Sequence, residues 1–363
     1  MKILHQLCSV PTAPFAEQHV IDYIQRFAAA RPKLKFSRDS FNNLLLELPA
    51  RKKSPRLVFV AHMDHPGFVA RRMLDKKTLQ ADFRGGVLSE YVNGAKVKFF
   101  DNNREIPGVV IAVKGSPYPS AATVRLTSTS SVESRLSVSP NSPGMFDQGE
   151  SRIKNGKFYS RVCDDLAGVA SALTMLDELL KKPPQNPVAV LLTRAEEDGF
   201  VGAIASVLHP KLLKKSDRII SIETSAMQLV ARQGDGVVLR VGDRTSIFNS
   251  AFMFFLHEQA QALAKRDKKF KYQRSLMPGG TCEATVFDLY GYTTGAICVP
   301  LGNYHNMDRE KKKIGPEYVD VNDWKNMVKL FVQLANHVQE FDPHFGPLRQ
   351  RIEKRFNERK RLL

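Results

Sequence analysis

The sequence has few cysteines and no stretch that resembles a membrane span. Its four cysteines, Cys8, Cys163, Cys282 and Cys298, form no Cys-x-x-Cys pair. This spacing argues against a thiolate zinc site or a disulfide framework and is typical of the reducing cytoplasm. No run approaches the roughly 18 apolar residues of a membrane helix, and the opening MKILHQLCSV lacks the pattern of a signal peptide. We therefore expect a cytoplasmic protein with no membrane partner.

Internal repeats and low-complexity tracts are also missing, and the composition is that of a globular protein. A chain of 363 residues, 43% of them hydrophobic, suits one large α/β domain with an insertion, or two domains. The net charge of +17 could indicate binding to nucleic acid or an anionic surface. The basic residues do not gather in one stripe, although residues 347–363 contain seven Lys and Arg against two Glu.

The hydrophobic pattern indicates strands alternating with helices. Four fully apolar segments are predicted to be strands, at residues 57–61, 187–193, 219–223 and 295–299. Amphipathic helices are predicted at residues 12–30, 163–182, 248–266 and 320–341. Apolar strands alternating with helices predict an α/β fold, with a mostly parallel sheet covered by helices on both faces.

Residues 72–158 have a different pattern, with short β-type segments between Gly, Pro, Asn and Ser turns. We predict a small inserted β domain there, and a catalytic α/β domain built from residues 1–71 and 159–346. Residues 347–363 are predicted to be a basic C-terminal tail. Because Leu348, Ile352, Phe356 and Arg359 recur at helical spacing, this tail is expected to form a helix that packs on the core or on a neighbouring subunit.

Histidines and acids follow the apolar strands, where ligands of parallel sheets bind. They are His62 and Asp64 after the first strand, Glu196 and Glu197 after the second, Glu223 at the end of the third, and His305 after the fourth, with Asp164–Asp165 opening a helix. Each group alone is a weak signal, because such residues are also common as structural, surface-exposed or helix-capping groups. Their joint order, with each group at a strand end or a helix start, is the specific signal.

So many carboxylates in one pocket would raise one another's pKa, and burial would raise it further. A pair of divalent cations resolves this conflict, because the two ions can share a bridging carboxylate and activate a water. Nitrogen and oxygen ligands without thiolate favour zinc, with cobalt and manganese as alternatives. We therefore expect two divalent metal ions in each subunit.

The chain resembles the dinuclear-metal aminopeptidases of the glutamyl and tetrahedral aminopeptidase branch, also called cellulase M-like. The resemblance rests on AHMDHPGF, CDDLAG, TRAEEDGFVGA, SIETS, PGGTCEATVF and PLGNYHN, which span residues 61–306. The position of the β-rich segment, between His-x-Asp and Asp-Asp, is also similar to this branch. In the related carboxypeptidases and deacylases, the extra domain follows the Glu-Glu motif.

The resemblance implies a role for each candidate residue. The implied metal ligands are His62, Asp164, Glu197, Glu223 and His305, with Asp164 as the bridge. Glu196 is the implied general base, and Asp64 is implied to orient the imidazole of His62. The implied function is removal of N-terminal residues from short peptides with a free N-terminus. Homo-oligomers assembled through the inserted domain are also implied.

Two departures from the family pattern affect the site. The family often has Asp at the position of Glu223, and its GGTDA is here GGTCEA, with Cys282 in the acidic place and Glu283 beside it. The first rival interpretation is a metal-dependent carboxypeptidase or amide deacylase on the same core. The second is a non-catalytic basic binding protein that uses its tail. The position of the insertion argues against the first rival and the intact motifs argue against the second, so we favour the aminopeptidase and expect no nucleic-acid partner.

Overall fold

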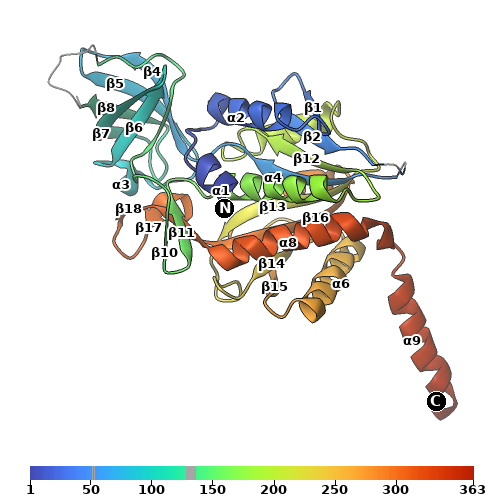
Figure 1. Cartoon of the computed structure of the whole chain (residues 1–363). Helices are drawn as coiled ribbons and strands as arrows, with labels where there is room; N and C mark the ends of the chain where they lie inside the picture. The colour runs from blue at the N-terminus through green and yellow to red at the C-terminus, as the bar shows by residue number, and fades with distance from the viewer. Residues whose placement is uncertain (51, 53, 128–135) are drawn as a thin grey trace.

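The computed structural model describes residues 1–50, 52, 54–127 and 136–363, so residues 128–135 of the predicted β segment lie outside it. A large sheet and a barrel organise the described chain (Figure 1). The sheet runs β1 (Lys35–Arg38), β2 (Leu44–Leu48), β12 (Val188–Thr193), β3 (Leu57–His62), β13 (Arg218–Ala226), β16 (Thr293–Gly302), β19 (Glu317–Asp320), β11 (Lys157–Ser160) and β10 (Arg152–Lys154). Strands β14 (Val237–Gly242) and β15 (Tyr272–Leu276) branch from β16.

The sheet is mixed, so the prediction of a mostly parallel sheet was wrong. Strands β12, β3, β13 and β16 run parallel at its centre, and these are the four strands expected from the sequence. The pairs β1–β2, β2–β12, β14–β16, β16–β19, β11–β19 and β10–β11 are antiparallel. These outer strands are short or less uniformly apolar, so hydrophobicity alone did not reveal them.

Helices cover both faces of the sheet, as the strand pattern predicted. In β3, the side chains of Leu57 and Phe59 join the hydrophobic cluster on one face, and Val58 joins the cluster on the other. The first cluster includes side chains of α1 (Lys2–Leu7), α2 (Gln18–Ala29), α4 (Leu166–Lys181), α6 (Ser250–Arg266) and α8 (Val321–His337). The second includes side chains of α5 (Val201–Leu208) and α7 (Glu283–Leu289).

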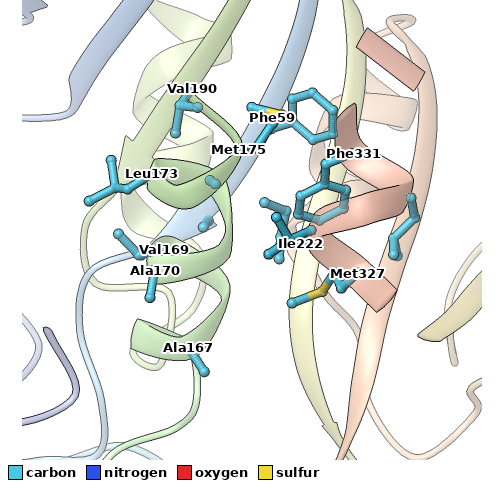
Figure 2. Close-up of a cluster of buried hydrophobic side chains, with 14 of the residues drawn as sticks. Phe59, Ala167, Val169, Ala170, Leu173, Met175, Val190, Ile222, Met327 and Phe331 are labelled. Atoms are coloured by element: carbon cyan, nitrogen blue, oxygen red, sulfur yellow. The ribbon is translucent and has the colours of Figure 1, made fainter. Parts of the chain in front are cut away.

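The centre of the larger cluster lies between α4, α8 and the parallel strands (Figure 2). The rings of Phe59 in β3 and Phe331 in α8 have centroids 4.8 Å apart. Leu173 in α4 and Ile222 in β13 are completely buried in the same cluster. Burial of side chains of this size contributes about 1.5–3 kcal/mol each. This packing holds the helix that follows Asp164 against the strands that carry His62 and Glu223.

Six strands between β3 and β10 form a closed barrel with its own buried cluster, which includes Phe68, Phe99 and Phe146 (Figure 1). Its strands are β4 (Gly67–Met73), β5 (Thr78–Arg84), β8 (Ala121–Leu126), β7 (Arg104–Lys114), β6 (Lys96–Asp101) and β9 (Pro143–Phe146), with the short helix α3 (Ser89–Val92) beside them. The predicted limits 72 and 158 do not coincide with this barrel. It begins earlier, and β10 and β11 pair with the large sheet instead.

Two ends of the chain differ from the expected helices. The first amphipathic helix covers only Gln18–Ala29, because Phe15 has a left-handed φ of 65° that interrupts any helix reaching back to residue 12. The tail forms α9 (Gly346–Arg359), which projects away from the body (Figure 1). Ile352 and Phe356 are 60% and 55% exposed, so α9 does not pack on the core as one alternative predicted. Within the described residues, we find no helix with the length and apolar character needed to cross a bilayer.

Candidate metal centre

The candidate residues meet at the carboxyl ends of the central parallel strands. His62 is the last residue of β3 and pairs in register with Thr193, the last residue of β12, so the Glu196–Glu197 loop begins beside it. Glu223 lies in the carboxyl half of β13. Asp164 comes just before α4, and His305 lies in the 3₁₀ turn Tyr304–Asn306 after β16. Parallel pairing of neighbouring strands therefore explains why distant residues converge here.

Two groups of ligand atoms share Asp164. In one group, atoms of His62, Asp164 and Glu223 lie within 4.8 Å of one another. In the other, atoms of Asp164, Glu197 and His305 do the same. The carboxylate of Asp164 reaches both histidines, with Oδ1 3.4 Å from Nε2 of His62 and Oδ2 3.8 Å from Nε2 of His305. A carboxylate with one oxygen facing each group has the arrangement of a bridging ligand.

Both histidines are oriented by their other ring nitrogen. Nδ1 of His305 donates to the carbonyl of Gly86 at 2.9 Å, and Nδ1 of His62 lies 3.2 Å from the carbonyl of Asp64. A carbonyl can only accept, so each Nδ1 carries a hydrogen and each Nε2 faces the carboxylates. Metal-binding histidines are commonly fixed in this way.

Three buried polar atoms of the centre lack hydrogen-bond partners in the described structure. Oδ1 of Asp164, Oε1 of Glu197 and Nε2 of His305 are buried, and none has a hydrogen-bond partner among the described residues. Nε2 of His305 and Oε1 of Glu197 lie 3.1 Å apart. Unpartnered buried polar atoms are costly, and here they all face one cluster. The residues present therefore fit divalent cations, which would satisfy all three atoms.

The electrostatics of the cluster also favour bound cations. Burial raises the pKa of Glu223 to about 7 although the guanidinium of Arg240 lowers it, and burial raises the pKa of Glu196 well above its ordinary value. Burial lowers the pKa of His305, but the carboxylates of Glu197 and Asp164 outweigh it and raise that pKa to about 9. The protein thus holds several acids where their ionised forms repel one another, and positive charge relieves this repulsion.

Asp64 lies behind the cluster and connects two loops. Its carboxylate accepts hydrogen bonds from the backbone N–H groups of Glu196 at 3.0 Å and Glu197 at 3.1 Å. Oδ1 of Asp64 is also 3.5 Å from Nδ1 of His62. Asp64 therefore fixes the Glu-Glu loop relative to the strand that ends at His62.

Sequence reasoning missed two buried acids that act in the same way. Glu317 accepts hydrogen bonds from the backbone N–H groups of Cys163 at 2.7 Å, Asp164 at 3.0 Å and His305 at 2.9 Å. Glu17 accepts from the N–H of Ala195 at 3.0 Å and pairs with the side chain of Arg194, immediately before the Glu-Glu pair. The available signal was an acid in an apolar setting, such as Glu317 at the start of EYVDV.

The loop that departs from the family pattern is divided between core and cavity. Cys282 and Glu283 are buried, and Oε2 of Glu283 accepts from the hydroxyl of Thr193 at 2.9 Å. Burial raises the pKa of Glu283 to about 8. Residues 277–281, just before them, line the cavity next to the cluster. Neither Cys282 nor Glu283 is among the residues that line this cavity.

The cavity has a volume of about 400 Å³ and includes His62, Glu196, Tyr304 and Arg309 among its lining residues. It is large enough for a few amino-acid residues and opens beside the acidic cluster. A pair of metal-ligand sets at the carboxyl edge of an α/β sheet, next to such a cavity, is the arrangement of a metal-dependent hydrolase.

The family is identified by sequence comparison. A profile of the M42 glutamyl aminopeptidase family matches residues 42–330, and the chain belongs to this family. The protein is a metal-dependent aminopeptidase, which makes it a peptide hydrolase. The family resemblance seen in the motifs is thereby confirmed.

Three relatives share between 21% and 24% of their residues with this chain. A protein of Acetivibrio thermocellus named provisionally as an aminopeptidase is 24% identical over 304 residues. The match covers 81% of this chain and 86% of that protein. Aminopeptidase APDkam598 from the archaeon Desulfurococcus kamchatkensis has a similar structure, with a TM-score of 0.77, 21% identity and coverage of 94% and 97% of the two chains. For the TET1 peptidase of Pyrococcus horikoshii, the TM-score is 0.75, with 21% identity and coverage of 92% and 98%.

Proposed function

We propose that the chain releases N-terminal residues from short peptides with a free α-amino group, using two divalent cations in each subunit. The observation that carries this proposal is the pair of ligand groups that share Asp164. His62, Asp164 and Glu223 would hold one cation, and Asp164, Glu197 and His305 would hold the other. Zinc is the preferred ion for such imidazole and carboxylate ligands, with cobalt and manganese as alternatives.

Glu196 is proposed as the general base. It lines the cavity beside His62, and its backbone N–H is held by Asp64. Atoms of Glu196 and Glu197 also form a third group with His62, so either glutamate could be a ligand. We assign Glu197 as the ligand because His305 approaches it at 3.1 Å and because it belongs to the group that includes Asp164. Glu196 then remains free to handle protons.

Bound divalent cations polarise the scissile carbonyl and make a water molecule more acidic. The carboxylate of Glu196 accepts a proton from the attacking water and later delivers it to the nitrogen of the leaving amine. Asp64 keeps Glu196 in place through the backbone and orients His62 through its ring nitrogen. The free α-amino group of the substrate would be held at the metal centre, which would explain cleavage at the N-terminus rather than within the chain.

The barrel is proposed to be a separate domain through which copies of the chain assemble. A hydrophobic cluster of its own and strand pairing that closes on itself support the first part. The Pyrococcus horikoshii relative is described as assembling into a tetrahedron or a large octahedral shell, which supports a homo-oligomer here. We further propose a cytoplasmic location, which four unpaired, buried cysteines in the described structure support. No nucleic-acid or membrane partner is proposed.

The deciding experiment compares a peptide with its N-acetylated form after metal loading. Protein is prepared without chelators, its metal content is measured, and hydrolysis is assayed with zinc, cobalt and manganese on a panel of aminoacyl-nitroanilides. The free peptide should be cleaved, and the acetylated form should be a very poor substrate. Equal cleavage of both, or cleavage of the acetylated form alone, would favour an amide deacylase. Release of residues from the C-terminus would favour a carboxypeptidase. Sedimentation gives the mass of the assembly.

A further inference from the structure

A small basic hairpin follows His305 and borders the catalytic cavity. Strand β17 (Met307–Asp308) pairs antiparallel with β18 (Lys313–Ile314), and Arg309 lies in the connecting turn. Met307 is buried in the hydrophobic cluster of the barrel, and Ile314 packs against that cluster. In the turn, the carboxylate of Asp308 accepts from the backbone N–H of Lys311 at 3.0 Å and from its Nζ at 2.9 Å. The hairpin is therefore anchored at its base and closed at its turn.

Arg309 is the exposed cation of the cavity. Of the two arginines that line it, Arg240 is buried and already donates to Ser225 Oγ at 3.0 Å and to the carbonyl of Gly280 at 3.2 Å. Arg309 is exposed and makes no hydrogen bond or ion pair with other described residues. Its guanidinium keeps its charge at every physiological pH and matches a carboxylate with two parallel N–H donors.

The cavity therefore has the candidate metal centre at one end and an uncompensated cation at the other. The buried end holds the acidic cluster of Asp164, Glu197 and Glu223, whereas Arg309 lies at the exposed rim. A short peptide carries a positive amino group at one end and a negative carboxylate at the other. If the amino end lies at the buried cluster, the rest of the peptide extends outward past the rim, because the cluster is closed on its inner side by the sheet.

We infer that Arg309 binds a carboxylate on the leaving side of the substrate, namely the C-terminal carboxylate of a di- or tripeptide. This inference rests on the proposed function, and it makes the protein selective for very short peptides with a free C-terminus. A downstream acidic side chain offers the same chemistry, as does an acidic N-terminal side chain, so the experiment has to separate these sources. One peptide residue spans about 3.3–3.6 Å, so selectivity should fall as the peptide lengthens.

The test compares Leu-Ala with Leu-Ala-amide, using metal-loaded wild-type protein and Arg309→Ala. We expect wild type to hydrolyse the free acid with about tenfold higher kcat/KM, mainly through a lower KM. Arg309→Ala should lose this preference by losing activity on the free acid while keeping its activity on the amide. The matched control is Lys313→Ala, which removes the same charge from the same hairpin but from a residue that does not line the cavity. It should keep the preference.

Further substrates identify the source of the carboxylate. Leu-Glu-amide against Leu-Gln-amide tests a downstream acidic side chain, and Glu-Ala-amide against Gln-Ala-amide tests an N-terminal one. The inference is overturned if Arg309→Ala keeps the preference for the free acid, or if Lys313→Ala loses it equally. It is also overturned if Arg309→Ala changes kcat/KM only for the substrates that differ in an acidic side chain. Failure of the proposed function has a different result, because wild type would then hydrolyse neither Leu-Ala nor its amide or, as a carboxypeptidase, would also hydrolyse N-acetyl-Leu-Ala, which an aminopeptidase leaves intact. A melting temperature equal to that of wild type confirms that Arg309→Ala is folded.

Discussion

The carboxylate of Glu317 accepts a hydrogen bond from the backbone N–H of Asp164 at 3.0 Å. The same side chain holds the N–H of His305, so one buried acid fixes two candidate ligands that come from distant parts of the chain. Carboxylates that accept several backbone hydrogen bonds form strong, directional contacts. The positions of Asp164 and His305 therefore depend on a residue that would touch neither cation.

Replacing Glu317 with glutamine should weaken metal binding. An amide cannot accept at both of its polar atoms, so at least one of the N–H groups now held by Glu317 would face another donor. Changes to residues that orient metal ligands typically lower affinity by about 10- to 100-fold. Calorimetric titration with zinc measures this directly. Glu310→Gln, in the exposed part of the nearby hairpin, is the control and should bind zinc like wild type.

Glu196→Gln should retain the metals and lose turnover. Removal of a general base typically lowers kcat by about two to four orders of magnitude, whereas a neutral amide of the same shape leaves the ligand groups around Asp164 unchanged. Metal analysis and steady-state kinetics on one preparation separate the two effects. The exposed neighbour Asp198 provides the control variant Asp198→Asn. Nearly normal turnover in Glu196→Gln would assign the proton transfer to Glu197 instead.

The metal-free protein should become less stable as the pH rises, in part because of Glu283. Burial raises the pKa of this carboxyl group to about 8 from an ordinary value of 4.5. Between these two pH values the folded state holds a proton that the unfolded state has released, so the free energy of unfolding falls as pH increases. Urea unfolding at pH 5, 6.5 and 8 measures the trend. Glu283→Gln should show a shallower dependence, and a slope identical to that of wild type would contradict the prediction.

Deletion of residues 349–363 should leave the fold intact. The side chains of α9 from Arg349 onward are exposed, and Ile352 and Phe356 make no hydrophobic cluster with the body in the described structure. We expect a melting temperature within about 2 °C of the full chain, since surface changes rarely exceed ±0.5 kcal/mol. Calorimetry and sedimentation of the two forms check this. A large fall in melting temperature together with a smaller sedimenting mass would show that α9 is buried against a second copy.

The central strands and the candidate ligands could be predicted because their signals are local. Apolar runs marked β3, β12, β13 and β16, and the polar residues after them had to lie at the same edge. The antiparallel outer strands have no such signal, because their burial depends on neighbours brought together by folding. Glu317 was missed for the same reason, since it lies 153 residues from Asp164 in the chain. Phe15 shortened a predicted helix at its N-terminal end through its backbone conformation, which hydrophobic periodicity does not report.

The first and last strands of the barrel lie side by side. Its first strand, β4, pairs with its last, β9, through Phe68 with Gly144 and Val69 with Pro143. The chain therefore returns to the large sheet close to the point where it left, although most of the barrel lies between. The two ends of this segment are therefore held close together, as the ends of a short turn would be. Closing a long loop costs entropy, and the packing of the barrel offsets that cost. Changes in barrel size or sequence can thus accumulate without moving the strand ends that carry His62 and Glu223.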